Sequence, residues 1–122
     1  MKPSPRGFLP DFSRYLSDDY PIVDAYKNST LISKLCRLLS ELPVAVNPAR
    51  ELQQKGCCKK LEKFTPKDKH EKSFIEKCSF QEGQLYYAAF GDCSYRIVFG
   101  INSSERIAYF FALDTKHSIR KG

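Results

Sequence analysis

The stretch YRIVFGINSSERIAYFFAL, residues 95–113, decides the fold class of this chain. Its first seven residues alternate with the period of two that is typical of a strand, and NSSE at 102–105 has the composition of a hairpin turn. The second run, RIAYFFAL, is apolar at positions that fall on both faces of a sheet. We therefore predict an antiparallel hairpin whose second strand is central in the sheet or covered on both sides.

Arg96 is the only charged residue in the first strand of this hairpin. The alternation places Arg96 on one face with Val98 and Gly100, while the larger apolar side chains share the other face. An unpaired guanidinium is costly to bury. Arg96 therefore either pairs with a carboxylate, or its face of the sheet opens onto an anionic ligand.

The segments before the hairpin predict helices and one or two further strands. The run CSFQEGQLYYAAF, residues 78–90, indicates one strand or two around Gly83. Upstream, residues 28–42 carry leucines at helical spacing, and Pro43 ends that helix. Apolar residues within 11–20 show the same spacing and predict an earlier helix. Two helices followed by strands predict an α+β domain with a helical hairpin laid on a sheet.

The rest of the chain predicts less regular structure around one domain, 1–122, of ordinary size. Residues 1–10 hold three prolines and are expected to form an irregular arm. Residues 43–56 are interpreted as a connector. Residues 55–77 are dense in lysine and glutamate, and within them 65–72 is almost wholly polar. We expect 65–72 to be an exposed loop.

The composition restricts the partners and the compartment. A net charge of +6 favours a polyanionic partner, although an excess of basic residues can also simply keep a protein soluble. The five cysteines are an odd number, the first twelve residues lack an apolar leader, and Cys36 is expected on the apolar side of its helix. This pattern predicts free thiols in a reducing cytoplasm. No apolar run reaches the length of a membrane span.

The layout resembles the RelE/ParE toxin superfamily, including its HigB-like branch. In those proteins a strand carrying Tyr-Arg and two hydrophobic residues is followed by a turn, a very apolar strand and a short basic end. Here the matching pieces are 95–98, 107–113 and the cations of 116–120. The stretch 18–43 resembles the helical hairpin of the family. The resemblance implies an N-terminal helical hairpin packed on a small, mainly antiparallel twisted sheet, whose other face is concave and cationic.

The resemblance also implies a function. Many members are endoribonucleases that cut mRNA in the ribosomal A site and are neutralised by an antitoxin. The chain is then expected to be the toxin of a toxin–antitoxin system, cytoplasmic and monomeric when free, with mRNA on the ribosome and a cognate antitoxin as partners. Cleavage through the ribose 2′-hydroxyl requires no metal or cofactor. Two alternatives stay open: a non-catalytic binding module of the same fold, and a ParE-like gyrase inhibitor.

Three residues are expected to carry the chemistry. Arg96 on a rigid strand would present its planar fork to a phosphate, where the resemblance puts the family's phosphate-stabilising arginine. His117 would exchange the proton, because histidine titrates near neutral pH. Lys116 would neutralise charge on the phosphoryl oxygens. The residues expected to bind substrate are Arg120, Lys121, Tyr87 and Lys60.

Two of these assignments leave alternatives. Tyr86 and Tyr87 are adjacent and point to opposite faces, so either could stack on a base, and core packing is the alternative for each. Lysines found in the family on the strand before the arginine are missing from LYYAAF, and Lys59, Lys60 and Lys63 could reach the site from the connector instead. A zinc site built from the cysteines at 57, 58 and 78 with His70 lacks the C-x₂-C spacing, so no metal is expected.

Overall fold

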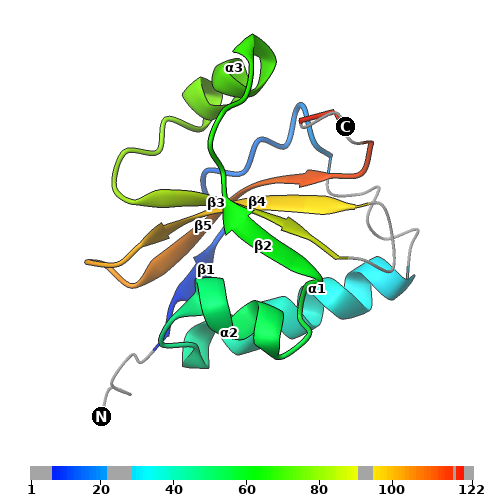
Figure 1. Cartoon of the computed structure of the whole chain (residues 1–122), viewed down its shortest axis with the longest axis vertical. Helices are drawn as coiled ribbons and strands as arrows, with labels where there is room; N and C mark the ends of the chain where they lie inside the picture. Colours follow the sequence, from blue (N-terminus) through cyan, green and yellow to red (C-terminus); the bar gives the residue numbers. More distant parts are fainter. Residues whose placement is uncertain (1–6, 22–28, 91–94, 117, 120–122) are drawn as a thin grey trace.

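A five-stranded mixed sheet forms the centre of the computed structural model, with strand order β1-β5-β4-β3-β2 (Figure 1). The structure describes residues 7–21, 29–90, 95–116 and 118–119. Three strand pairs are antiparallel, and β1 pairs with β5 in parallel. The elements are β1 Leu9–Asp11, α1 Ser29–Glu41, the 3₁₀ turn η2 Leu42–Val44, α2 Pro48–Gln54, β2 Lys60–Lys63, α3 Lys69–Cys78, β3 Gln84–Ala89, β4 Arg96–Asn102 and β5 Ile107–Asp114.

The predicted hairpin is confirmed. β4 and β5 pair from Arg96↔Asp114 to Asn102↔Ile107, and β5 lies between β4 and β1 as a central strand. One irregularity interrupts the ladder, where Val98 pairs with Ala112 but Phe99 pairs with Phe110. The skipped residue, Phe111, is completely buried. This β-bulge places two successive residues of β5, Phe111 and Ala112, in the core on the same side of the sheet.

Helices cover both faces of the sheet, α1 and α2 below it and α3 above it in Figure 1. We call these the α1 face and the α3 face. The core on the α1 face joins leucines of α1 to Ile97, Phe99 and Phe110 of the central strands. The core on the α3 face joins Phe74 of α3 to Val98 and Phe111. An apolar strand such as β5 is stable here because side chains on both of its faces leave water.

The predicted N-terminal helical hairpin is wrong. Residues 9–11 form β1, and the chain then runs along β5 in turns instead of a helix. The Leu16 amide donates to the Phe111 carbonyl at 2.9 Å, and the Leu113 amide donates to the Tyr15 hydroxyl at 3.0 Å. Apolar residues at helical spacing therefore pack against a strand edge. α1 is confirmed as a single helix, and residues 22–28 lie outside the described part of the chain.

The sequence predicted too little regular secondary structure for residues 43–77, which were interpreted as a connector and a charged segment. Residues 43–56 contain α2, and residues 55–77 contain β2 and most of α3. The expected exposed loop at 65–72 ends at Asp68, whose carboxylate caps α3 by accepting the Glu71 amide at 2.9 Å. Glu71 in turn accepts the Lys67 amide at 3.0 Å. This reciprocal pattern stabilises a helix start within a segment that is otherwise polar.

Four of the five cysteines lie in the described part of the chain, and all four are free thiols. Cys57, Cys58 and Cys78 are buried, but Cys36 is exposed, so its predicted place on the apolar side of α1 is wrong. Among the described residues, no helix is both long and apolar enough to cross a membrane.

Candidate nucleic-acid interface

One end of the sheet carries a cross-strand row of four residues, which we call the basic row. The strand register aligns Lys60 of β2 with Ala89 of β3, Ala89 with Arg96 of β4, and Arg96 with Asp114 of β5. Directly paired residues point to the same face of a sheet, here the α3 face. The row lies at the end of the sheet where β3 and β5 end and β4 begins, on the right in Figure 1.

The basic row is the outermost layer of a face that is mainly apolar further inward. The next row inward begins with Glu62, whose carboxylate lies 3.6 Å from the Lys60 ammonium. It continues through Tyr87, Val98 and Ala112, which are all buried under α3. The two cations of the basic row sit roughly 10 Å apart at their Cα atoms, because two inter-strand spacings separate them. Among the described residues of the sheet, the residue between them in the row is Ala89, which has only a methyl side chain.

Arg96 is half-buried, and its guanidinium folds back on its own strand. Its Nη1 donates to the Tyr95 carbonyl at 3.1 Å. Asp114 lies opposite in the register, yet no carboxylate forms an ion pair with Arg96 among the residues that the structure describes. The predicted pairing with a carboxylate is therefore not seen there. The guanidinium has five N–H donors, so this bond leaves most of its capacity for an acceptor oxygen.

Asp114 instead organises the loop that follows β5. This carboxylate is 1% exposed and accepts four hydrogen bonds. Oδ1 accepts the Lys116 amide at 3.2 Å, the Ser118 amide at 3.0 Å and the Ser118 hydroxyl at 3.1 Å. Oδ2 accepts the Ile119 amide at 2.9 Å. A buried carboxylate that accepts this many bonds is satisfied, and it fixes the path of the backbone beside the basic row.

Further contacts hold the same loop against the domain. Ile119 is completely buried in the core of the α3 face. His70 of α3 donates from Nε2 to the Ser118 carbonyl, and the hydroxyl of Tyr20 hydrogen-bonds the Ser118 side chain. Burial is the main cause that raises the pKa of Tyr20, so the hydroxyl stays protonated at neutral pH. The loop therefore presents the exposed Lys116 from a fixed backbone.

The predicted site residues fall into three groups. The structure brings Arg96, Lys60 and Lys116 to one end of the sheet. Tyr87 is 6% exposed, and its ring packs edge-on against Phe64 at 5.3 Å, so it offers no open face to a base. The remaining expected residues, which lie outside the described part of the chain, are His117, Arg120 and Lys121.

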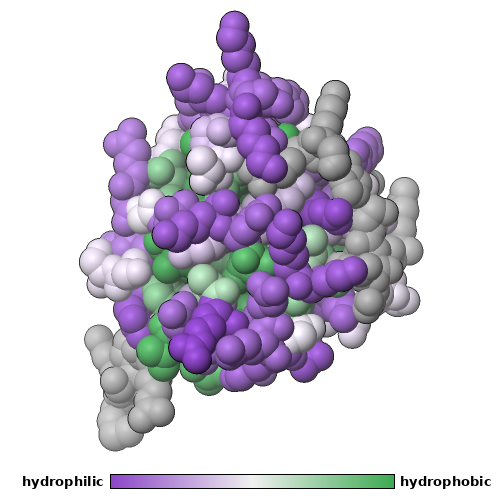
Figure 2. Space-filling view, in the orientation of Figure 1, coloured by the Kyte–Doolittle hydropathy of each residue, from purple (hydrophilic) through white to green (hydrophobic). Residues whose placement is uncertain are grey.

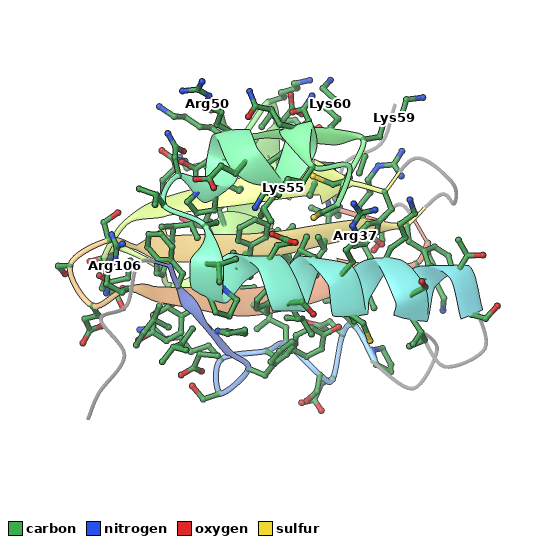
Figure 3. All side chains as sticks on the ribbon, turned by 90° about the horizontal axis from the view of Figure 1, so that it is seen from below. Arg37, Arg50, Lys55, Lys59, Lys60 and Arg106 are labelled. Atoms are coloured by element: carbon green, nitrogen blue, oxygen red, sulfur yellow. The ribbon has the colours of Figure 1, made fainter. Side chains whose placement is uncertain are left out.

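Other cations gather near β2, among them Arg50, which the sequence alone did not indicate (Figure 3). Arg50 of α2 and Lys59 are exposed and project with Lys60 from the β2 side of the molecule. Arg37 and Lys55 have structural roles instead. The Arg37 guanidinium donates to the Lys55 carbonyl at 2.7 Å, and the Lys55 ammonium pairs with Glu41 at 2.9 Å. Lys59 is therefore the further exposed cation next to the basic row, whereas Arg50 belongs to α2 on the α1 face.

A shared metal site for the cysteines is incompatible with the fold. Cys57 and Cys58 belong to the core on the α1 face, whereas Cys78 belongs to the core on the α3 face. The sheet therefore separates them. Across the described ranges, no three His, Cys, Asp or Glu side chains are grouped so that they could hold a metal ion.

Comparison of the chain with protein-family models, with curated proteins and with solved structures finds no match in any of the three.

Proposed function

We propose that the protein binds RNA at the end of the sheet that carries the basic row. The observation that supports this most directly is the alignment of Lys60 and Arg96 on one face, beside a loop that presents Lys116. Arginine and lysine are the side chains that contact phosphates, and arginine does so through two parallel hydrogen bonds. Three cations from three separate elements fit a chain of phosphates better than a single small anion.

A purely structural explanation covers only part of the row. Lysines on an edge strand prevent edge-to-edge aggregation, and β2 is an edge strand with lysines at both ends. That explanation fits Lys60. It does not fit Arg96, because β4 lies in the interior of the sheet and needs no such protection.

We propose further that the protein cleaves the bound RNA, as the toxin of a toxin–antitoxin pair acting on mRNA at the ribosome. In this reaction the ribose 2′-oxygen attacks the adjacent phosphorus while His117 accepts its proton. The bond from phosphorus to the 5′-oxygen breaks, and that oxygen takes up a proton. The products are a 2′,3′-cyclic phosphate and a 5′-hydroxyl. Arg96 and Lys116 would stabilise the charge on the phosphoryl oxygens.

The binding proposal can be tested with a matched pair of lysine variants. Lys60 and Lys63 are both exposed and belong to the same short strand, but only Lys60 faces α3, since Lys63 aligns with Tyr86 on the α1 face. We expect Lys60→Ala to weaken binding of a fluorescein-labelled 12-nucleotide RNA and to lower the salt slope by about 0.7. Lys63→Ala, with the same loss of charge, should change neither. Equal losses in the two variants would show diffuse electrostatic attraction and refute the basic row as the site.

The cleavage proposal needs a separate assay. RNA is incubated with the protein in EDTA, with and without programmed ribosomes, and the product ends are identified by mass spectrometry. We expect cyclic phosphate ends, with slower cleavage by Arg96→Ala and His117→Ala. Intact RNA together with blocked gyrase supercoiling would support the gyrase-inhibitor alternative. Intact RNA and active gyrase would support the non-catalytic binding module.

A further inference from the structure

A pocket of about 210 Å³ lies where α3 meets the segment that ends at Tyr20. Among the described residues, its lining consists of Tyr20, His70, Ser73, Phe74 and Lys77. The four residues from α3 follow one another at i, i+3, i+4 and i+7, so they share one face of that helix. The pocket is smaller than the roughly 300–1,000 Å³ typical of sites for drug-sized ligands, so it suits a single small ring system.

Two aromatic rings form the apolar part of the pocket. The rings of Tyr20 and Phe74 are perpendicular, with 5.8 Å between their centres. Phe74 is buried and packs against Phe64, with ring centres again 5.8 Å apart. The Tyr20 amide donates to the Leu16 carbonyl at 2.9 Å, and the Tyr20 hydroxyl hydrogen-bonds the Ser118 side chain. Both rings are therefore held in place before a ligand arrives, which lowers the entropic cost of binding.

The polar side chains of the pocket offer hydrogen-bond donors and acceptors. His70, Ser73 and Lys77 are all exposed. Nε2 of His70 donates to the Ser118 carbonyl, which leaves Nδ1 of the neutral ring as an acceptor. The Ser73 hydroxyl can both donate and accept. The Lys77 ammonium pairs with Asp19 at 2.9 Å, so its charge is already compensated.

These features favour a neutral planar ring as the ligand. Lys77 is the one described lining residue with a permanent charge, and its pairing with Asp19 makes the pocket a poor site for a phosphate. The surface over α3, at the top of Figure 2, is mainly hydrophilic, which disfavours an apolar protein segment. A nucleobase has a flat face that stacks on aromatic side chains and an edge of donors and acceptors.

We propose that this pocket holds one unstacked base of the RNA whose phosphates bind the basic row. The inference rests on the proposed RNA binding and does not require cleavage. Tyr20 also lines a second, smaller hollow together with Asp114, Lys116 and Ser118, so the pocket adjoins the loop after β5. Lys116 is two residues from Ser118, and their Cα atoms are therefore at most about 7 Å apart. A nucleotide whose base enters the pocket can thus place its phosphate near Lys116.

The test compares a fluorescein-labelled 12-nucleotide RNA with an abasic ribose-phosphate chain of equal length and charge, in polarisation assays on the full chain. We expect wild type to bind the RNA about fivefold or more tightly than the abasic chain, because a stacked base contributes at least that much. Ser73→Leu fills the pocket without changing charge or adding a ring on which a base could stack. It should lower RNA affinity to that of the abasic chain and leave the salt slope unchanged. Ser33→Leu, at an exposed serine of α1 outside the pocket, should change neither.

A second measurement locates the base directly. RNA that contains 5-bromouridine is irradiated with the protein, and the crosslinked residue is identified by mass spectrometry. We expect the crosslink at Tyr20 or within α3 in wild type, and its loss in Ser73→Leu, which should stay folded because leucine favours a helix more than serine does.

Three results would each overturn the base pocket while leaving RNA binding at the basic row intact. They are equal affinities of wild type for the two chains, wild-type RNA affinity in Ser73→Leu, and a crosslink confined to residues outside the pocket. If wild type binds neither the RNA nor the abasic chain, the proposed function itself fails and the base pocket fails with it.

Discussion

Replacing Asp114 with asparagine tests whether one buried carboxylate holds the C-terminal loop. In the wild type its two oxygens accept four hydrogen bonds, three from backbone amides and one from the Ser118 hydroxyl. An asparagine keeps one acceptor oxygen, and its NH₂ group is placed against an amide donor. The change removes the charge from the bonds that survive and loses at least one outright. Hydrogen bonds to a charged group are each worth about 1.5–3 kcal/mol.

We therefore expect Asp114→Asn to lower the free energy of unfolding by about 2–4 kcal/mol, measured by urea denaturation with circular dichroism. The control is Ser118→Ala, which removes only the hydroxyl bond and should cost about 1 kcal/mol. The double variant should lose less than the sum of the two, because Asp114 and Ser118 share that bond. A loss for Asp114→Asn within about 0.5 kcal/mol of the loss for Ser118→Ala would refute the proposed role, because free-energy changes of separate substitutions add only to within about that amount.

Three further outcomes follow from individual contacts. Arg96→Lys should weaken RNA binding about tenfold in a polarisation assay, because a lysine cannot make the bidentate phosphate contact; unchanged affinity would contradict that contact. Burial raises the pKa of the Cys58 thiol to about 11 and of the Cys78 thiol to about 12, against 9.0 for a free thiol. The native state therefore keeps protons that the unfolded state releases, and stability should fall as the pH rises above 9, less so in Cys78→Ala, as alkaline urea titrations would show. Gly100→Ala would place a methyl group 2.6 Å from the Phe80 ring and should cost about 1–3 kcal/mol in the same denaturation assay, whereas no loss would mean that the ring moves freely.

Local periodicity was enough to predict the parts of the fold that depend on burial alone. The hairpin of β4 and β5 and the helix α1 follow from which residues are apolar and how they are spaced, although α1 ends at Glu41 and Pro43 lies in η2. The same alternation predicted that Arg96 and Val98 point to one face of the sheet and Ile97 and Phe99 to the other. The two cores of the structure confirm this prediction, since Val98 belongs to one core and Ile97 and Phe99 belong to the other.

Periodicity failed where long-range contacts compete with it. Phe12, Tyr15 and Leu16 have helical spacing, yet Phe12 stacks on Phe110 and the Leu16 amide bonds to β5. The start of α3 was missed for the opposite reason. Its Asp68-x-x-Glu71 capping signal was present in the sequence, but the surrounding lysines suggested a solvated loop.

The sequence by itself determined which residues of β4 and β5 share a face, because side chains alternate along any strand. It could not determine that Lys60 stands in the same row as Arg96, which follows thirty-six positions later in the sequence. That alignment depends on the register of two strand pairs, and register is set by how whole strands pack rather than by local spacing. The fixed loop behind Lys116 was likewise decided by tertiary structure. A carboxylate at Asp114 becomes an organising group only when the fold buries it beside four donors.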